Sequence, residues 1–205
     1  MARQTKFQFS SIGVSIQEIY ILHEITLEAL TNSFTGSVNP KLATPEFMEK
    51  HENGKTSVKE WVYREIDLIF CFLVIALMEA RFRVDFILRT DKKDKEEVSL
   101  KMRKIREEYS KSPLYQIPIN QIINVWINEF DDRRLRGSLN NLIKAIDNFR
   151  NWFAHGRYWR ENRALETYNF EVIYAFALQT ESIIGKKLKH FDKNYPQQLQ
   201  TFLTP

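Results

Sequence analysis

Two residues suited to chemistry on phosphate groups lie close together in this chain, Arg150 and His155. An arginine side chain keeps its charge at any physiological pH, and the fork of its guanidinium matches the oxygens of a phosphate. A histidine side chain gains and loses a proton near neutral pH. The pair therefore offers a fixed positive charge and a titratable group, a combination that suits chemistry on a phosphate.

Arg150 stands where a charged side chain needs a partner. Apolar residues recur around it at helical spacing, namely Leu139, Leu142, Ile143, Ile146, Phe149 and Phe153. At about 100° per residue, Arg150 falls inside this apolar stripe, so its charge requires a carboxylate or an anionic ligand. The alternative is an arginine whose head reaches outward from a core stripe, beside a histidine with a structural role.

The geometry of the pair depends on where the helix ends. On an ideal helix, residues 150 and 155 point about 140° apart, which separates the two side chains. Gly156 follows directly, and glycine is the residue that most often ends a helix in a left-handed conformation. A helix that ends at Ala154 or His155 would let His155 turn back beside Arg150.

The motif resembles that of a known superfamily. Arg150-Asn151-Trp152-Phe153-Ala154-His155 is similar to the Arg-Asn-x-x-x-His signature of HEPN domains, small all-helical domains of prokaryotic toxins, phage-defence proteins and CRISPR-associated ribonucleases. The continuation through Gly156-Arg157-Tyr158-Trp159 resembles a stand-alone HEPN subgroup. The resemblance implies catalytic roles for Arg150, His155 and Asn151. It also implies a homodimer with a composite cleft, and an antitoxin or a defence system as a further partner.

The groups that the sequence lacks narrow the chemistry. It contains no phosphate-cradling glycine loop, no carboxylate cluster for magnesium and no histidine-cysteine ligand set, and His23, His51 and His190 are scattered singly. RNA can be cleaved without a metal, because its own 2′-hydroxyl attacks the adjacent phosphate when a proton carrier and a cation assist. The leading hypothesis is a metal-independent endoribonuclease without a cofactor. The alternatives are a non-catalytic RNA- or nucleotide-binding module and a helical protein-interaction subunit.

Residues around the motif are candidates for RNA binding. Aromatic rings can stack on exposed bases and arginines can pair with phosphates, so the candidates are Trp152, Arg157, Tyr158, Trp159 and Arg160. At least one of the aromatic rings is expected to belong to the core. A basic cluster also precedes the motif helix, at Arg133, Arg134 and Arg136. Such a surface favours an acidic partner such as RNA, although the formal net charge of the chain is only +4.

A carboxylate on an earlier helix has two potential uses. Glu79 follows an uninterrupted apolar run over residues 68–78, which suits a central core helix and is too short to span a bilayer. Glu79 could face Arg150 and hold its guanidinium in position. It could instead be exposed and paired only with Arg83, one helical turn further on.

Helical periodicity along the chain of 205 residues predicts a single domain, an all-α bundle of about five to six helices around a long hydrophobic helix. Capping boxes at Ser15–Glu18 and Ser57–Glu60 start helices expected to end near Gly36 and Thr90. Further helices are expected over residues 93–110, 121–130, 138–155 and 169–188. Non-helical segments are expected as a surface loop at 37–56, a basic turn at 131–137 and a loosely held tail at 190–205.

The single cysteine and the amino terminus predict the compartment. Cys71 lies in the apolar run and has no partner for a disulfide within the chain, so we expect a buried, inert thiol. The first ten residues lack the apolar stretch of a signal peptide. The sequence therefore predicts a cytoplasmic protein that does not interact with a membrane.

Overall fold

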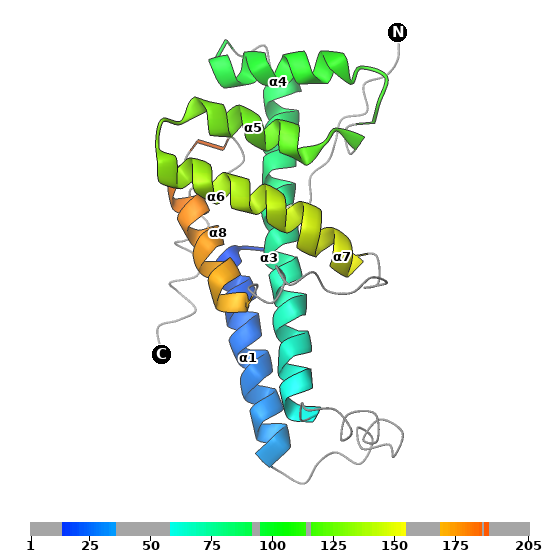
Figure 1. Ribbon diagram of the computed structural model, residues 1–205, viewed down its shortest axis with the longest axis vertical. Helices are drawn as coiled ribbons and strands as arrows, with labels where there is room; N and C mark the ends of the chain where they lie inside the picture. Colours follow the sequence, from blue (N-terminus) through cyan, green and yellow to red (C-terminus); the bar gives the residue numbers. More distant parts are fainter. Residues whose placement is uncertain are drawn as a thin grey trace.

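The computed structural model describes residues 14–35, 58–91, 95–113, 116–154, 169–185 and 187–188. The regular structure of these residues is helical throughout and includes no strand (Figure 1), which confirms the predicted all-α class. No helix within them is long and apolar enough to cross a membrane. The expected loop at 37–56, the tail at 190–205 and the second cap at Ser57 lie outside the described residues.

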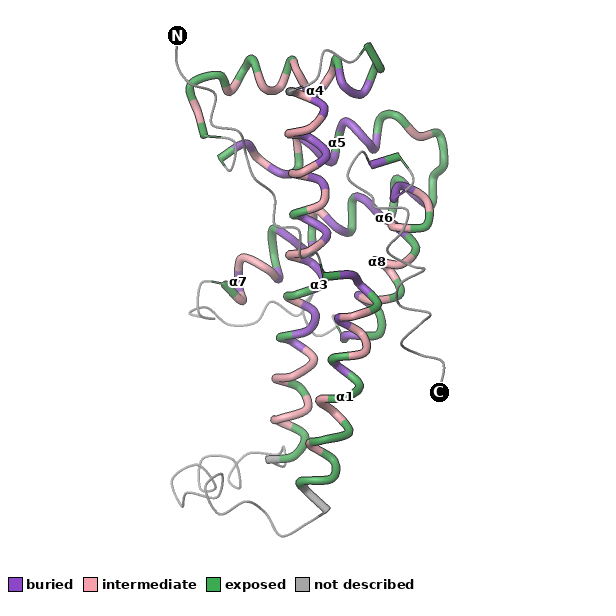
Figure 2. The backbone as a smooth tube through the Cα atoms, turned by 180° about the vertical axis from the view of Figure 1, so that it is seen from behind, coloured by how far each residue is buried: buried purple, intermediate pink, exposed green. Residues whose placement is uncertain are grey.

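The long central helix is α3, which spans Val58–Asp91 and 34 residues. It contacts α1, α4, α5, α8 and the segment around Arg150. Figure 1 shows these elements distributed along the length of α3. Its middle is not enclosed on every side, although the apolar run over residues 68–78 suited a central core helix. Ile69 and Leu73 each remain 40% exposed, because no neighbouring helix covers that face within the described residues. In Figure 2, buried residues run along α3, α5 and α6; α5 and α8 pack on α3, and α6 packs on α5 and α8.

Helix α1, Ile16–Thr35, lies beside the amino-terminal half of α3. The capping box expected at its start is formed. The backbone N–H of Ser15 donates to Glu18 Oε2 at 2.6 Å, and that of Glu18 donates to Ser15 Oγ at 3.0 Å. These two bonds satisfy N–H groups that have no partner inside the helix, so the residues that start α1 are readable from sequence.

Two helices close the carboxyl-terminal end of α3. Helix α4 spans Glu97–Glu108 and helix α5 spans Ile119–Glu129, close to the helices expected at 93–110 and 121–130. Pro118 precedes the first residue of α5, a position where its missing N–H costs nothing. Helix α5 presents Ile122, Ile123 and Trp126 to the core.

A buried polar network ties these helices to α3. Asp85 is 0% exposed and Arg89 is 3% exposed. Arg89 Nε donates to Asp85 Oδ1 at 2.8 Å, and Trp126 Nε1 donates to Asp85 Oδ2 at 3.2 Å. The other guanidinium nitrogens of Arg89 donate to Glu96 Oε2 (2.5 Å), Ser99 Oγ (3.2 Å) and the carbonyl of Lys187 (2.7 Å). Charges buried at this depth are tolerated because each has several partners.

The last helix, α8, spans Phe170–Ile184 and packs against α1, α3 and α6. Asn169 caps it as expected, since its side chain accepts the N–H of Val172 at 2.9 Å. The helix ends at Ile184, earlier than the predicted Leu188. Its aromatic residues stack on α1, where Tyr20 and Tyr174 have ring centroids 4.5 Å apart.

Removal of the buried carboxylate in this network should be costly. Asp85→Ala leaves the guanidinium of Arg89 and the indole N–H of Trp126 without their shared acceptor, so we expect a loss of about 3–5 kcal/mol in the free energy of unfolding. Urea denaturation followed by circular dichroism measures this loss. The control is Glu97→Gln on the exposed surface of α4, which should change stability little. Equal losses in the two variants would contradict the role of the network.

Candidate functional site

The helix that carries the motif begins earlier than the sequence predicts. Helix α6 spans Arg133–Lys144, and Asp132 caps it by accepting the backbone N–H groups of Arg134 at 2.7 Å and Leu135 at 3.3 Å. The predicted basic turn at 131–137 and the predicted start at Ser138 are therefore wrong. The aspartate cap and the burial of Leu135 begin the helix, and Gly137 is accommodated on its exposed side.

The motif helix is also not a continuous α-helix. After α6 the backbone forms a π-helical segment, η2, over Ala145–Arg150, and then the short helix α7 over Asn151–Ala154. The N–H of Asn151 reaches the carbonyl of Ile146, five residues earlier. A π-turn accommodates an extra residue within one turn, and such turns are frequent at functional sites. Arg150 is the last residue of the widened segment.

Arg150 meets Glu79 of α3 across the helix interface. Glu79 Oε2 accepts Arg150 Nη2 at 2.5 Å and Arg150 Nε at 3.0 Å, while Glu79 Oε1 accepts Arg83 Nε at 2.9 Å. Glu79 is 6% exposed. Of the two uses considered for Glu79, exposure with Arg83 as its sole partner is wrong. The carboxylate is buried and pairs with both arginines, one through each oxygen.

Two neighbours complete this arrangement, which we call the Arg150 cluster: Arg150, Glu79, Arg83 and Asn151. Arg150 Nη1 donates to Asn151 Oδ1 at 2.8 Å, and Arg83 Nη1 donates to the carbonyl of Ile117 at 3.1 Å. The two guanidiniums are thus each held by a second acceptor. Charged, multiply bonded pairs of this kind fix the planes of the groups that they join.

The cluster has an excess of positive charge, which lies on its solvent side. Two guanidiniums share one carboxylate, so the cluster carries one excess positive charge at neutral pH. The side chains of Arg150 and Arg83 are 29% and 24% exposed, whereas that of Glu79 is 8% exposed. The negative group lies inside and the positive groups reach the surface. Such an arrangement can attract and orient an anion such as a phosphate.

Of the remaining site residues predicted from sequence, the structure describes Trp152 and Asn151. Trp152 is 6% exposed and its ring lies 6.2 Å from that of Phe149, so Trp152 is a core aromatic that offers little surface for base stacking. Asn151 is half-buried and contacts Arg150 directly. The others lie outside the described residues, and they are His155, Arg157, Tyr158, Trp159 and Arg160.

A buried histidine was not singled out from the sequence. His23 is 4% exposed, its Nε2 lies 2.7 Å from Asp67 Oδ1 and its Nδ1 lies 3.2 Å from Glu24 Oε1. Its ring stacks on Phe170 with centroids 3.9 Å apart. His23 therefore joins α1, α3 and α8. No local pattern reveals this contact, since Asp67 follows 44 residues later.

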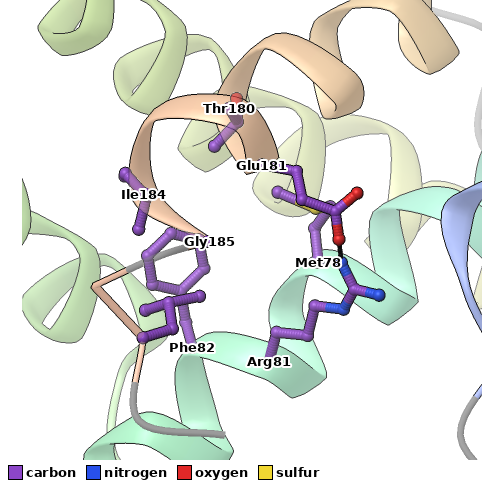
Figure 3. Close-up of a pocket in the computed structure, with 8 residues that line it drawn as sticks. Met78, Arg81, Phe82, Thr180, Glu181, Ile184 and Gly185 are labelled. Atoms are coloured by element: carbon purple, nitrogen blue, oxygen red, sulfur yellow. Dashed lines mark ion pairs between the residues drawn. The ribbon is translucent and has the colours of Figure 1, made fainter. Parts of the chain in front are cut away.

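The rest of the described structure offers little to hold a metal or a substrate. No group of three or more His, Cys, Asp or Glu side chains within the described residues could hold a metal ion. A hollow between α3 and α8 lies beside Met78, Phe82 and Thr180, and the ion pair of Arg81 and Glu181 borders it (Figure 3). It holds about 210 Å³, including space open to solvent. At helical spacing, its α3 residues point to a different side than Glu79 and Arg83.

Loss of the Glu79 charge should lower the stability of the fold. Glu79→Gln would leave Arg83 and Arg150 facing each other without a carboxylate, so we expect a loss of about 1.5–3 kcal/mol in the free energy of unfolding. In an Arg150→Met background the same change should cost less, because one repulsive partner is gone. The control is Glu28→Gln at an exposed position of α1, and urea denaturation compares the variants. Additive effects of the Glu79 and Arg150 changes would contradict direct coupling.

Cys71 should be unreactive in the folded protein. Burial, with a smaller contribution from the charge of Asp67, raises the pKa of its thiol from 9.0 to about 12. Because the thiolate is the reactive form, a thiol reagent such as Ellman's reagent at pH 8 should label native protein very slowly and urea-unfolded protein fully. Rapid labelling of native protein at pH 8, at the rate of a free cysteine, would show that the thiol is accessible.

No protein-family model, curated protein or solved structure matches this chain. The motif and the chemistry of the Arg150 cluster are therefore the features of this chain that point to a function.

Proposed function

We propose that this protein is a metal-independent endoribonuclease of the HEPN type, with Arg150 and His155 as its catalytic residues. The observation that carries the proposal is the anchoring of Arg150 by the buried Glu79, at 2.5 Å and 3.0 Å, while the arginine side chain remains 29% exposed. An arginine held in a fixed plane at the surface is organised in advance to bind a phosphate.

The reaction requires two groups beyond the RNA itself. The 2′-oxygen of the RNA attacks the adjacent phosphorus, its proton leaves, and the departing 5′-oxygen takes up a proton. His155 carries a proton in this exchange, because imidazole titrates near neutral pH. Arg150 stabilises the negative charge that develops on the phosphate oxygens. The products are a 2′,3′-cyclic phosphate and a 5′-hydroxyl.

The other members of the cluster have positioning roles. Glu79 is buried and both its oxygens accept from arginines, so it orients Arg150 and is not a proton carrier. Asn151 accepts Arg150 Nη1 through Oδ1, which leaves its Nδ2 group to donate to a phosphate or to His155. Arg83 donates to Glu79 Oε1, the carboxylate oxygen that Arg150 does not use, and so fixes the orientation of Glu79.

The proposed active form is a homodimer. By the resemblance, two copies of the motif line one cleft, so that each chain supplies half of the cationic site. The proposed setting is the cytoplasm. The resemblance further implies a toxin-antitoxin or phage-defence system, with an antitoxin or another defence component as the partner.

The second candidate is a module that binds RNA or a nucleotide, or locks helices together, without cleavage. Every guanidinium nitrogen of Arg150 already has an acceptor within the chain, either Glu79 or Asn151. These three bonds favour a structural role for the arginine. A catalytic role requires a phosphate to accept the two further N–H groups, one on Nη1 and one on Nη2.

Cleavage chemistry separates the two candidates. Single-stranded RNA incubated with the protein in EDTA should be cut, leaving 2′,3′-cyclic phosphate and 5′-hydroxyl ends that mass spectrometry identifies. His155→Ala should abolish cutting and His51→Ala should not, while Arg150→Lys should lose at least about 100-fold because the planar fork is gone. Activity per chain should fall on dilution below the dimer dissociation constant. Cleavage that requires a metal, or full activity in folded His155→Ala, would refute the proposal.

A further inference from the structure

We propose that two copies of this chain associate through an exposed apolar side of α3 and α1, with the two α3 helices antiparallel. The proposed function calls for two copies but does not say where they meet. The surface is built on apolar residues of α3 that we call the α3 seam, and they are Val62, Ile66, Ile69, Leu73, Ala76, Leu77, Ala80 and Val84. At about 100° per residue these positions fall within a sector of about 100°, and no polar or charged residue between Val62 and Val84 falls in it.

The seam lies on the side of α3 that faces away from the core. Three of the residues that α3 buries, Cys71, Met78 and Phe82, are on the opposite side of the helix. No seam residue is buried, and Ile69 and Leu73 are each 40% exposed. Figure 2 shows that the half of α3 beside α1 is largely pink and green. A continuous apolar strip left in water is unfavourable, so it indicates a surface that another molecule covers.

Helix α1 extends the apolar surface on the same side. The contacts between α1 and α3 run in opposite sequence order, so the two helices are antiparallel. His23 of α1 contacts Asp67 of α3, and one residue before each of them stands an apolar side chain, about 100° away from the contact. These two side chains are Leu22 and Ile66. Because antiparallel helices turn in opposite senses when seen from one end, both point to the same side. Leu22 is 51% exposed, and Ile25, three residues later, is 56% exposed.

The seam is complementary to a reversed copy of itself. Its positions 62, 66, 69, 73, 76 and 80 follow at spacings of four and three, the repeat by which two helices interlock. The large side chains precede the small ones. An antiparallel pair therefore places Ile69 against the partner's Ala80 and Leu73 against the partner's Ala76, so that a large side chain meets a small one in the central layers. A parallel pair would set alanine against alanine and leave voids there.

The size of the surface is that of a specific interface. From Val62 to Ala80 the seam is about 27 Å long at 1.5 Å per residue, and two helices packed side by side are about 20 Å wide. Each copy therefore offers about 500 Å², and two copies together bury about 1,000 Å² or more, which is the lower bound for a specific protein interface.

The chemistry of the surface favours a second copy over a lipid or a nucleic acid. The seam carries no cation that could pair with a phosphate. Helix α1 contains Glu18, Glu24 and Glu28 and no lysine or arginine, so an anionic membrane would repel it. A second seam offers the apolar contacts and the matching repeat together.

The antiparallel pairing also places both Arg150 clusters on one edge of the dimer. Glu79 lies on one flank of the seam, and a two-fold axis between antiparallel helices keeps the same flank of both helices on the same side. With Leu73 against the partner's Ala76, the two Glu79 positions are nine residues apart along the helix direction, roughly 14 Å. A shared site for RNA at this edge rests on the proposed function, whereas the apolar surface does not.

Charges placed on the seam test the interface. Sedimentation equilibrium of the wild-type protein should give twice the chain mass of 24.5 kDa. Leu73→Glu and Leu22→Glu should each raise the dimer Kd at least about 100-fold, because an unpaired carboxylate would be buried between the copies. Both residues are exposed in the single chain, so the variants should keep the helical circular dichroism of the wild type. The matched control is Leu100→Glu on α4, an apolar residue of 47% exposure outside this surface, which should leave the Kd unchanged.

Cysteine cross-linking tests the direction of the pair. Ile69→Cys mixed with Ala80→Cys should form a disulfide-linked dimer under mild oxidation, and neither variant alone should do so. In the antiparallel pair two cysteines at position 69 are about 16 Å apart along the helix, too far for a disulfide. Cys71 is buried and does not compete. Efficient cross-linking of either variant alone would indicate parallel helices and overturn the arrangement.

The outcomes separate this interface from the proposed function. A wild-type protein that stays monomeric, or Leu73→Glu and Leu22→Glu variants that dimerise as tightly as Leu100→Glu, would overturn the interface, whether or not the protein cuts RNA. A dimer that both seam variants dissociate would support the interface, even if the wild-type protein never cuts RNA and the proposed function fails.

Discussion

Two buried carboxylates on α3 need cationic partners, and much of the structure is organised to supply them. A charged group removed from water is costly unless it is paired and hydrogen-bonded. Glu79 is met by Arg83 of its own helix and by Arg150 at the end of η2. Asp85 is met by Arg89 and by the indole of Trp126 on α5. The positions of α5 and of the motif segment relative to α3 are thereby specified by directional bonds as well as by packing.

The same constraint links stability to the candidate chemistry. A carboxylate that orients an arginine for phosphate binding also neutralises part of the positive charge of that arginine. In the Arg150 cluster the second guanidinium of Arg83 restores an excess charge, and both arginines stay partly exposed while the carboxylate stays buried. The π-helical segment contributes by ending at Arg150, with Ile146 and Phe149 remaining in the core. Arg150 is thus held in place by Glu79 and is still exposed enough to contact a ligand.

Most of the fold was predictable because it depends on local patterns. The caps at Ser15 and Asn169 and the long apolar helix follow from short-range signals. The largest errors lie around α6. There Gly137 suggested a turn, whereas the Asp132 cap and the buried Leu135 begin a helix. The π-turn was also missed, since the apolar spacing of residues 139–153 fits a regular α-helix equally well.

The sequence by itself determined the helical class, the start of α1 and α8 at their caps, and the identity of Arg150, Asn151 and Glu79 as candidates. Helical periodicity, capping residues and the motif are all patterns of neighbouring residues, so they can be recognised without the tertiary structure. Only the tertiary structure decided between the two uses of Glu79, placed Trp152 in the core, and brought His23 to Asp67 and Asp85 to Trp126. The hydrogen bonds of Glu79, His23 and Asp85 join residues 41 to 71 positions apart in the sequence. Only the packing of helices around α3 brings these residues within reach of each other.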